Sequence, residues 1–296
     1  MNVSIVIVNY NTLKLTKACI DSVIEKTSGL EYEIILVDNA SSDGSSDVFK
    51  NDERIIFIEA SDNIGFGKAN NLGVKHAKGD YLFFLNSDTL LLNNAVDELW
   101  KFCESHKENM LGAVGCILCD VNGKPCHSYA KLATAKDLIL SYGIAPFCKS
   151  IAKKQMGIDA KDESADCFEV GYVTGADIFV HRDVLKTCGA FDPDFFMYSE
   201  EAEMQWRFKQ QGFKNLIIKT PKIIHMEGMS QAKKKSPTIK KILMTQTSLF
   251  LYVKKTSNKV VYALFRSLFP FTRLPFLLLS KRSIKEKVAY VKFLLS

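Results

Sequence analysis

One carboxylate, Asp88, stands between two apolar runs and needs a positive partner. Residues 81–85 (YLFFL) predict a strand buried on both faces, and residues 90–92 (LLL) are apolar again. A carboxylate in such a place is costly to bury unless a cation or several hydrogen bonds meet it. A divalent metal ion is one cation that carboxylate oxygens hold well. The alternative is that Asp88 forms a turn or caps the next helix.

A second group of acids opens the helical pattern at residues 199–212 (SEEAEMQWRFKQQG). Glu200 and Glu201 fall in its first turn, where the helix dipole favours ionised carboxylates. An ionised carboxylate can act as a general base and take the proton of an attacking hydroxyl. Glu203 and Arg207 are spaced i,i+4 and predict a structural ion pair. The alternative is that the acids only favour the start of the helix.

The elements that must position these side chains alternate between strand and helix in the first half of the chain. Apolar runs predict strands at residues 3–9, 32–38, 54–60 and 80–86. Helical patterns occupy residues 13–24 and 67–79, and a stronger helix follows Asn93, which can cap it. Short continuous apolar strands separated by helices predict a parallel sheet covered on both faces, and therefore an α/β fold.

Polar side chains gather where these strands end. They are Asn9 and Asn11, Asp38 and Asn39, residues 63–67, and residues 86–88. In parallel sheets the carboxyl ends of the strands are where ligands bind. We therefore expect one site that is assembled from these strand ends.

The second half of the chain is mixed. Strand patterns occur at residues 110–120, 168–182 and 213–225, and residues 130–165 predict irregular structure.

The composition of the 296 residues, 47% hydrophobic and 24% charged, is that of a globular protein and excludes wholesale disorder. Eight cysteines without regular spacing, and a start (MNVSIVIVNYN) without a basic segment, predict free thiols in a reducing cytoplasm.

Charge divides the chain into an acidic body and a basic tail. Residues 233–296 carry 15 Lys or Arg and one acid, Glu286, whereas residues 1–232 carry 24 basic and 32 acidic residues. A tail with a charge of +14 predicts a polyanionic partner, either nucleic acid or an anionic membrane surface.

Seven segments occur in the order in which family 2 glycosyltransferases carry them. They are SIVIVNYN, ILVDNASSDGS, NIGFGKANNLGV, FFLNSD, GADIFVHR, CGAFDPDFFMYSEEAEMQWR and HMEGMS. They resemble most the bacterial rhamnosyltransferase-like branch, over roughly residues 1–230. The resemblance implies a GT-A fold with a central, mostly parallel sheet, a nucleoside-diphosphate sugar as donor, a divalent cation (Mn²⁺ or Mg²⁺), and inversion at the anomeric carbon.

The resemblance also implies a metal site at Asp88 and His225. The segment NSD resembles the family's Asp-x-Asp-type metal motif, in which the last acid, here Asp88, binds the metal. Asn86 replaces the first acid, and we expect it to bond the ribose or a phosphate. His225 in HMEGMS matches a late histidine that approaches the metal or the diphosphate, and imidazole suits Mn²⁺ better than Mg²⁺. Its alternative is a packed or surface histidine.

The nucleotide is expected at the first strands. Asp38 resembles the family's acid that accepts the N3 hydrogen of uracil or thymine, which selects dTDP or UDP as the nucleotide of the donor; its alternative is a turn-forming role. Small residues before the helix at residues 67–79 allow the backbone to approach the nucleotide. The residues expected around the nucleotide are Asn9, Asn11, Asp38, Asn63, Gly65, Lys68 and Asn86.

Catalysis is expected from the acids at residues 200–201. The stretch YSEEAEMQWR matches the family's Glu-Asp-x-Asp stretch, whose second acid is the usual base, and Glu201 holds that position. Glu stands there where Asp is typical, so Glu200 is the alternative base. Gly175 and Ala176 match a segment that borders the acceptor, and Asp177 is expected to face it too.

Four other interpretations fit the sequence less well. Cys116, Cys119, Cys126 and His127 resemble a zinc quartet, but the first two lie in a strand pattern as small core residues. The loop at Gly65 lacks the third glycine of a dinucleotide fingerprint, which disfavours an oxidoreductase. A sugar nucleotidyltransferase would need a Gly-rich, basic loop after the first strand, where NYNTLKLTK stands instead. A nucleic-acid-binding protein would use the basic tail, but an acidic body repels nucleic acid.

We therefore expect two parts. Residues 1–232 form the catalytic domain, with a nucleotide-binding half at 1–110 and an acceptor-side half at 111–232; residues 233–296 form a basic, apolar helical tail. Residues 260–279 are long enough to span a bilayer, but Arg266, Arg273 and two prolines favour a segment lying in the membrane interface. The alternative is that the tail packs on the body or in a homodimer.

The function expected from the sequence is that of an inverting, metal-dependent hexosyltransferase. It would move a sugar, rhamnose being one candidate, to a saccharide or to a polyprenyl-diphosphate-linked acceptor during bacterial surface polysaccharide synthesis. We expect it in the cytoplasm, peripherally bound to the inner face of the plasma membrane, with no nucleic-acid partner.

Overall fold

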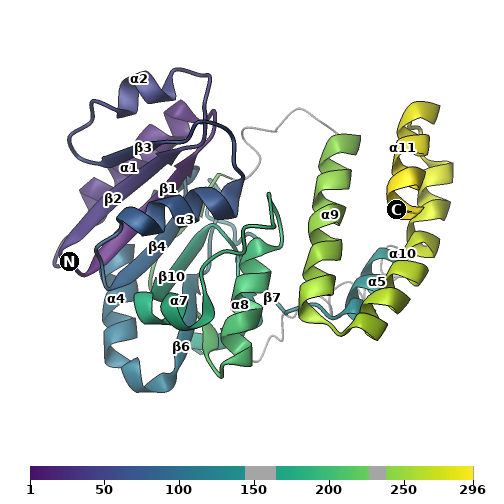
Figure 1. Ribbon diagram of the computed structural model, residues 1–296. Coiled ribbons are helices and arrows are strands. Elements are labelled where there is room, and N and C mark those ends of the chain that lie inside the picture. Colours follow the sequence, from purple (N-terminus) through teal and green to yellow (C-terminus); the bar gives the residue numbers. More distant parts are fainter. Residues whose placement is uncertain (144–164, 227–237, 296) are drawn as a thin grey trace.

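The computed structural model describes residues 1–143, 165–226 and 238–295, and its centre is an eight-stranded sheet (Figure 1). The strand order is β3-β2-β1-β4-β10-β6-β11-β8. The bounds are β1 (Val3–Asn9), β2 (Tyr32–Asp38), β3 (Ile56–Glu59), β4 (Tyr81–Asn86), β6 (Leu111–Cys116), β8 (Cys167–Val170), β10 (Asp177–His181) and β11 (Lys214–Ile218). Strands β3, β2, β1 and β4 pair in parallel, whereas β10 and β8 are antiparallel to their neighbours. The predicted α/β fold with a mostly parallel sheet is confirmed.

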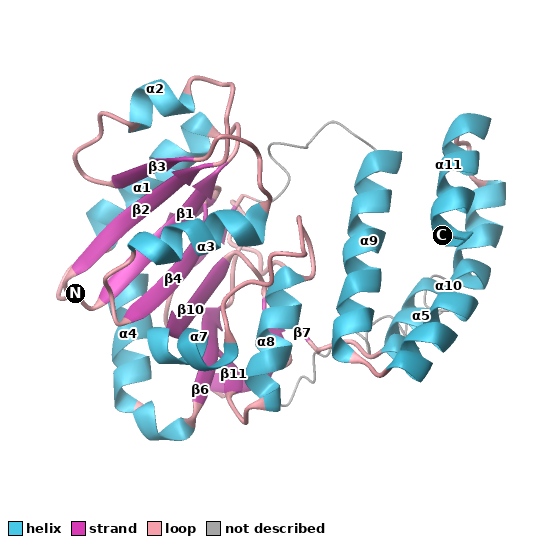
Figure 2. Ribbon diagram, viewed as in Figure 1, coloured by secondary structure: helices cyan, strands magenta, loops and turns pink. Residues whose placement is uncertain are grey.

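Helices cover both faces of this sheet (Figure 2). Helices α1 (Leu13–Lys26) and α4 (Ala95–Ser105) pack on one face, and α3 (Phe66–His76), α7 (Arg182–Cys188) and α8 (Glu200–Gln210) pack on the other. Strand β1 divides its side chains between them with the period of two that strands impose. Ile5 and Ile7 lie in the cluster that holds Ile20 of α1, whereas Val6 lies in the cluster that holds Met204 of α8.

Two expected strands are broken into shorter ones that pair at the edge of the site. Residues 213–225 form β11 and then β12 (Ile223–His225), which pairs antiparallel with β5 (Thr89–Leu91). Residues 168–182 form β8, β9 (Tyr172–Val173) and β10, and β9 pairs with β7 (Tyr129–Ala130). The pair of β5 with β12 brings the second half of the chain against the first half just beyond the end of β4.

Two local predictions were wrong. Residues 130–165 were expected to be irregular, but α5 (Ala135–Gly143) lies within them, since Leu138 is buried against the C-terminal helices. Residues 144–164 of that stretch lie outside the described residues. Asn93 does not cap the helix that follows: Asn94 precedes α4, and the Asn93 amide instead donates to Glu98 and to the Thr220 carbonyl.

The C-terminal part forms a helical layer beside the sheet domain (Figure 1). It comprises α9 (Ile239–Thr256), α10 (Lys259–Leu279) and α11 (Ile284–Leu295), with α5 packed against α10. Helix α9 fixes the layer to the body: the Ser248 hydroxyl donates to the Met197 carbonyl at 2.7 Å, and Lys255 lies 2.7 Å from both Asp192 and Asp194. The domain boundary expected between residues 232 and 233 lies outside the described residues.

Helix α10 is continuous through both of its prolines, Pro270 and Pro275. Within the described residues it is long and apolar enough to cross a membrane by length and composition, with a mean hydropathy of 1.2. Most of this helix lies outside the core: 22% of its most apolar stretch is buried.

Candidate active site

The ends of β1 and β2 form a closed hydrogen-bond network. The Asn9 amide donates to Asp38 at 2.6 Å and to the Ser41 hydroxyl at 3.0 Å, and Asp38 also accepts the Ser41 backbone N–H at 2.9 Å. Both Asn9 and Asp38 are fully buried. Asn11 is exposed beside them and its side chain accepts the Ser42 N–H at 2.7 Å. The predicted pair of Asn9 and Asp38 is thus brought together, with Asp38 bonded inside the protein.

The loop before α3 is fixed by asparagines. Asn39 donates to Asn63 at 3.1 Å and accepts the Ile64 N–H at 2.9 Å. Gly65 has a φ of +87°, and a Cβ there would lie 2.2 Å from the Phe196 carbonyl oxygen, so only glycine fits. This close approach brings the loop before α3 against the segment that leads into α8. Lys68 lies one turn into α3 with its side chain exposed.

Asp88 meets His225. The antiparallel pairing of β5 and β12 sets His225 opposite Thr89, and the imidazole Nε2 lies 3.2 Å from Asp88 Oδ1. The Asn86 amide nitrogen lies 3.4 Å from the same Nε2. The Asp88 carboxylate is partly open to solvent, at 21% exposure, so a ligand can reach it.

The distance between Asp88 and His225 suits two ligands of one cation. Neighbouring ligands of an octahedral ion with bonds of about 2.1 Å lie about 3 Å apart. Among the described residues no group of three or more His, Cys, Asp or Glu side chains could hold a metal. A divalent ion here would therefore complete its shell with water and substrate phosphates, which is how Mg²⁺ sites with few protein ligands work.

The start of α8 presents two carboxylates from a strained turn. Tyr198 and Ser199 have φ values of +74° and +66°, which non-glycine residues seldom adopt. Glu200 and Glu201 follow at once as the first residues of the helix; Glu200 is buried and Glu201 is half-buried. The predicted ion pair of Glu203 with Arg207 is confirmed, at 3.0 Å.

Burial changes the pKa of both carboxylates. Burial raises the pKa of Glu201 above its ordinary value. Burial raises the pKa of Glu200 well above its ordinary value, and the charge of Glu201 raises it further. The charged form of both carboxylates is therefore disfavoured, and the two adjacent groups are unlike ordinary exposed glutamates.

A single hollow of about 380 Å³ joins the two halves of the expected site. Asn86 and His225 line it together with Glu200, Glu201 and Gly175. The residues that line it are Phe66, Asn86, His127, Thr174, Gly175, Ala176, Met197, Tyr198, Glu200, Glu201 and His225. Five of these were not expected from the sequence: Phe66, His127, Thr174, Met197 and Tyr198. Phe66, Met197 and Tyr198 lie inside the segments that carry the family resemblance but were given no role there, and His127 was considered only as a zinc ligand.

The three residues expected on the acceptor side divide into two groups. Gly175 and Ala176 line the hollow, and the Ala176 carbonyl accepts the Asn86 N–H at 3.0 Å. Asp177 does not face it: its side chain is fully buried and accepts the Cys116 N–H at 2.7 Å. That expectation was wrong, because strand alternation turns Asp177 into the sheet. Burial raises the pKa of Asp177 to about 7.

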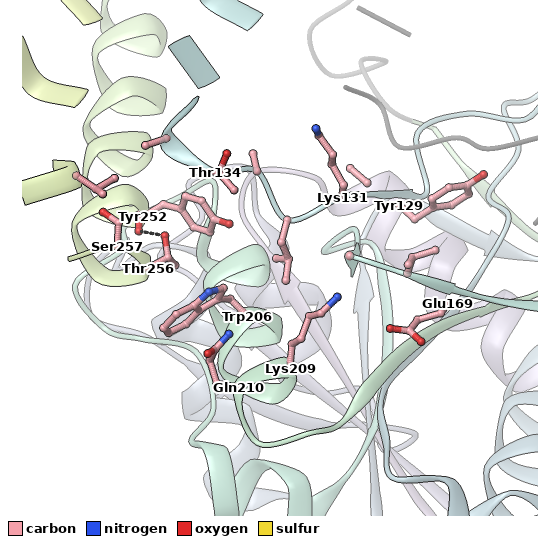
Figure 3. Close-up of a pocket in the computed structure, with 17 residues that line it drawn as sticks. Tyr129, Lys131, Thr134, Glu169, Trp206, Lys209, Gln210, Tyr252, Thr256 and Ser257 are labelled. Atoms are coloured by element: carbon pink, nitrogen blue, oxygen red, sulfur yellow. Dashed lines mark hydrogen bonds between the residues drawn. The ribbon is translucent and has the colours of Figure 1, made fainter. Parts of the chain in front are cut away.

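A larger hollow, of about 640 Å³, lies at the other end of α8 (Figure 3). Trp206, Lys209 and Gln210 of α8 face Tyr252 and Thr256 of α9 across it. It contains none of the residues singled out from the sequence. The smaller hollow is therefore the candidate active site, since Asn86, His225, Glu200 and Glu201 line it together. Asp88 and the residues expected at the first strands are not among its lining residues, although Asp88 contacts His225.

We expect Glu200→Gln to raise the stability of the protein at high pH and not at low pH. A carboxylate whose pKa is raised in the folded state loses stability as pH rises from its unfolded pKa to its folded pKa. The amide needs no proton on folding, so the substitution should gain about 1–3 kcal/mol at pH 8, with little gain near pH 4. Thermal melts across this range measure it.

Glu203→Gln on the same helix is the matched control. Glu203 is ion-paired with Arg207, so its neutralisation should lower the melting temperature at pH 8. Destabilisation of the Glu200→Gln variant at pH 8 would mean that Glu200 has an ionic partner, and would contradict this account.

The chain matches the sequence model of glycosyl transferase family 2 over residues 4–186. A Bacillus spizizenii protein named poly(ribitol-phosphate) beta-glucosyltransferase is 35% identical over 116 residues, 37% of this chain and 18% of that protein. The Myxococcus xanthus O-antigen biosynthesis protein RfbC is 23% identical over 243 residues, 77% of this chain and 18% of that protein. The chain thus spans less than a fifth of the length of these two relatives.

Solved structures share the fold. The mannosyltransferase PcManGT of Pyrobaculum calidifontis, in complex with GDP-Man and Mn²⁺, has a TM-score of 0.57 at 15% identity, covering 98% of this chain and 79% of that one. S. aureus TarS 1-349 in complex with UDP has a TM-score of 0.57 at 14% identity, covering 99% of this chain and 79% of that one. These likenesses confirm the predicted GT-A fold.

Proposed function

The chain belongs to glycosyl transferase family 2, and we propose that it transfers a hexosyl group from a nucleoside-diphosphate sugar, with inversion at the anomeric carbon. The observation that carries this proposal is the hollow that Asn86 and His225 line together with Glu200 and Glu201. Transfer of a sugar from a charged leaving group to a hydroxyl requires a general base and a site that stabilises the diphosphate. The acids of the hollow could supply the base, and Asn86 and His225 could border the diphosphate.

The donor is proposed to be a dTDP- or UDP-sugar. Asp38 would accept the N3 hydrogen of the pyrimidine, and Asn9, Asn11, Asn63, Gly65 and Lys68 would border the nucleotide. Asp38 has lone pairs to spare beyond its two bonds inside the protein, because each carboxylate oxygen can accept two hydrogen bonds. The complexes of related folds with UDP and with GDP-Man support a nucleotide-sugar donor as a class.

Asp88 and His225 are proposed to hold a divalent cation, Mn²⁺ or Mg²⁺, beside the donor diphosphate. Bound there, the cation would stabilise the negative charge that the departing diphosphate acquires. Their separation of 3.2 Å supports this role. Asn86 lies 3.4 Å from Nε2 of His225, and once a cation occupies that nitrogen the Asn86 amide would be free to bond the ribose or a phosphate.

Glu201 is proposed as the general base. Its raised pKa brings it nearer to neutrality, where a base is both ionised in part and able to retain a proton. It lines the hollow beside Gly175, whose lack of a side chain leaves room for an acceptor hydroxyl. Glu200 would remain protonated and keep the pair from carrying two adjacent charges.

The acceptor is proposed to be a saccharide or a polyprenyl-diphosphate-linked sugar in bacterial surface polysaccharide synthesis. The named roles of the relatives, poly(ribitol-phosphate) glucosylation and O-antigen biosynthesis, support this class. Rhamnose is a candidate for the transferred sugar because of the likeness of the sequence motifs to rhamnosyltransferase-like members. The reaction is proposed to take place in the cytoplasm, at the inner face of the plasma membrane.

A thermal-shift panel of UDP, dTDP, GDP, CDP and ADP, each with Mn²⁺ or with a chelator, tests the donor. We expect UDP or dTDP with Mn²⁺ to raise the melting temperature by roughly 5–10 °C, the effect of a ligand at about a hundred times its Kd. The chelator should remove most of this rise. A rise with purine nucleotides alone would contradict the role of Asp38, and no metal-dependent rise at all would contradict the proposed function.

A further inference from the structure

Helix α10 turns its two arginines inward. The Arg266 guanidinium lies 4.3 Å from the centre of the Phe250 ring, and the Arg273 Nε lies 3.2 Å from the Tyr290 hydroxyl. The inner face of the helix also buries Phe265 and Phe269 in the core of the helical layer. Both guanidinium groups therefore lie against side chains of the helical layer and not on the exposed face of α10.

The outer face of α10 is an uninterrupted apolar stripe. Its large side chains are exposed at 58% for Leu264, 51% for Leu268, 72% for Phe271, 69% for Leu278 and 87% for Leu279. Leu264, Leu268, Phe271 and Leu278 are spaced by four, three and seven residues, which places them along one side of the helix, and Leu279 follows Leu278 directly at the edge of that side. From Val260 to Leu279 no exposed residue of α10 is charged. The outer stripe (Leu264, Leu268, Phe271, Leu278 and Leu279) is the face that lacks a partner among the described residues.

An apolar hollow adjoins this stripe. It measures about 400 Å³ and lies between α10 and α5, with Leu268, Phe271 and Leu279 of the outer stripe in its walls. Ile139 and Gly143 of α5 line its other side. The hollow adds apolar surface beside the outer stripe, where a hydrocarbon chain could be accommodated.

Positive charge borders the outer stripe at both ends. Lys254 and Lys259 lie exposed at its start, and Lys281 and Lys285 lie exposed at its end. Between residues 238 and 295 the sole acid is Glu286, which pairs with Arg282 at 3.4 Å. The α11 residue Ile284, exposed at 81%, extends the apolar surface among these lysines.

We propose that α10 lies in the interface of an anionic lipid bilayer, with the outer stripe among the acyl chains and the flanking lysines at the headgroups. Amphipathic helices with aromatic and aliphatic side chains on one side and lysines around them bind in this way. This inference does not depend on the identity of the donor or the acceptor.

Two other occupants fit the outer stripe less well. A spanning arrangement would pull Phe265 and Phe269 out of the core and expose Arg266 to lipid. A second copy would bring lysine against lysine in either orientation, because both ends of the stripe are basic. An anionic bilayer satisfies the apolar side chains and the lysines together.

Flotation of the full chain with vesicles tests the proposal. We expect binding to vesicles of equal phosphatidylglycerol and phosphatidylcholine and little binding to phosphatidylcholine alone. The double variant Leu268→Gln and Phe271→Gln should bind about a hundredfold more weakly, tenfold per apolar side chain removed. Lys281→Glu with Lys285→Glu should weaken binding at least about tenfold, since each lysine near an anionic surface contributes about fivefold.

Val48→Gln with Leu92→Gln is the matched control. These two side chains are exposed at 46% and 51% on the catalytic body, away from the outer stripe. These two substitutions should leave binding to the anionic vesicles unchanged. A wild-type chain that stays unbound to anionic vesicles would overturn the proposal, as would equal loss in the control.

Two further outcomes would overturn it in favour of another occupant. A dimer in sedimentation velocity that the Leu268→Gln and Phe271→Gln variant abolishes, without flotation of the wild type, would assign the outer stripe to a second copy. Retention of the wild type in cell membranes after carbonate at pH 11 would assign α10 to a spanning helix. Release by carbonate is the expected result.

Discussion

Asp88→Ala is expected to lower the rate of transfer by about 10³-fold or more. Loss of a metal site removes several kcal/mol of charge stabilisation at the departing diphosphate, and each 1.36 kcal/mol is about tenfold in rate. The measurement is release of nucleoside diphosphate from the sugar nucleotide that the thermal-shift panel selects. The Asp88→Asn variant, which retains a hydrogen-bond acceptor for His225 but no charge, should lose nearly as much.

Asp62→Ala is the control for this substitution. Asp62 is an exposed acid in a neighbouring loop, and its loss should change the rate by less than about twofold. His225→Ala should fall between the control and Asp88→Ala, because it removes the softer ligand. Near-normal turnover of Asp88→Ala with an unchanged melting temperature would refute the metal-binding role.

Glu201→Gln is expected to lower kcat by about 10²–10⁴-fold, the contribution of general base catalysis, with little change in donor affinity. The wild-type rate should rise with pH through the raised pKa of Glu201, because only the ionised form accepts a proton. The variant should lose this acid limb. The pH profile of kcat with saturating donor measures both effects.

Glu200→Gln separates the two carboxylates. If Glu201 is the base, Glu200→Gln should retain the acid limb and lose less than about tenfold in kcat. The reverse result, with the limb lost in Glu200→Gln and kept in Glu201→Gln, would assign the base to Glu200. Retention of the limb in both variants would contradict a base at the start of α8.

The first half of the fold was predictable because its signals are local. Continuous apolar runs predicted β1 and β2 with the bounds that the structure has, and glycine or polar turns mark where they end. Asp88 and His225 were each singled out from a motif, but their contact depends on the pairing of β5 with β12. These two segments lie far apart in the chain, and each is too short to show a pattern of its own.

Features that depend on the surroundings of a residue could not be predicted from the sequence. Asp177 follows Gly175 and Ala176 directly, so a motif cannot reveal that the strand turns it away from the hollow. The positive φ values of Tyr198 and Ser199 arise from the turn into α8, and neither residue type signals them. Arg266 and Arg273 indicated an interrupted apolar segment, but the fold turns both toward aromatic rings.

Binding of Mn²⁺ measured by electron paramagnetic resonance tests the central claim most directly, because it reports the metal site without requiring the acceptor. Wild-type protein with UDP or dTDP should bind Mn²⁺ at a single site. Asp88→Ala should weaken that binding by at least about tenfold, His225→Ala should weaken it less, and Asp62→Ala should leave it unchanged. Binding by Asp88→Ala as tight as that of the wild type would contradict a metal-dependent transferase centred on this residue.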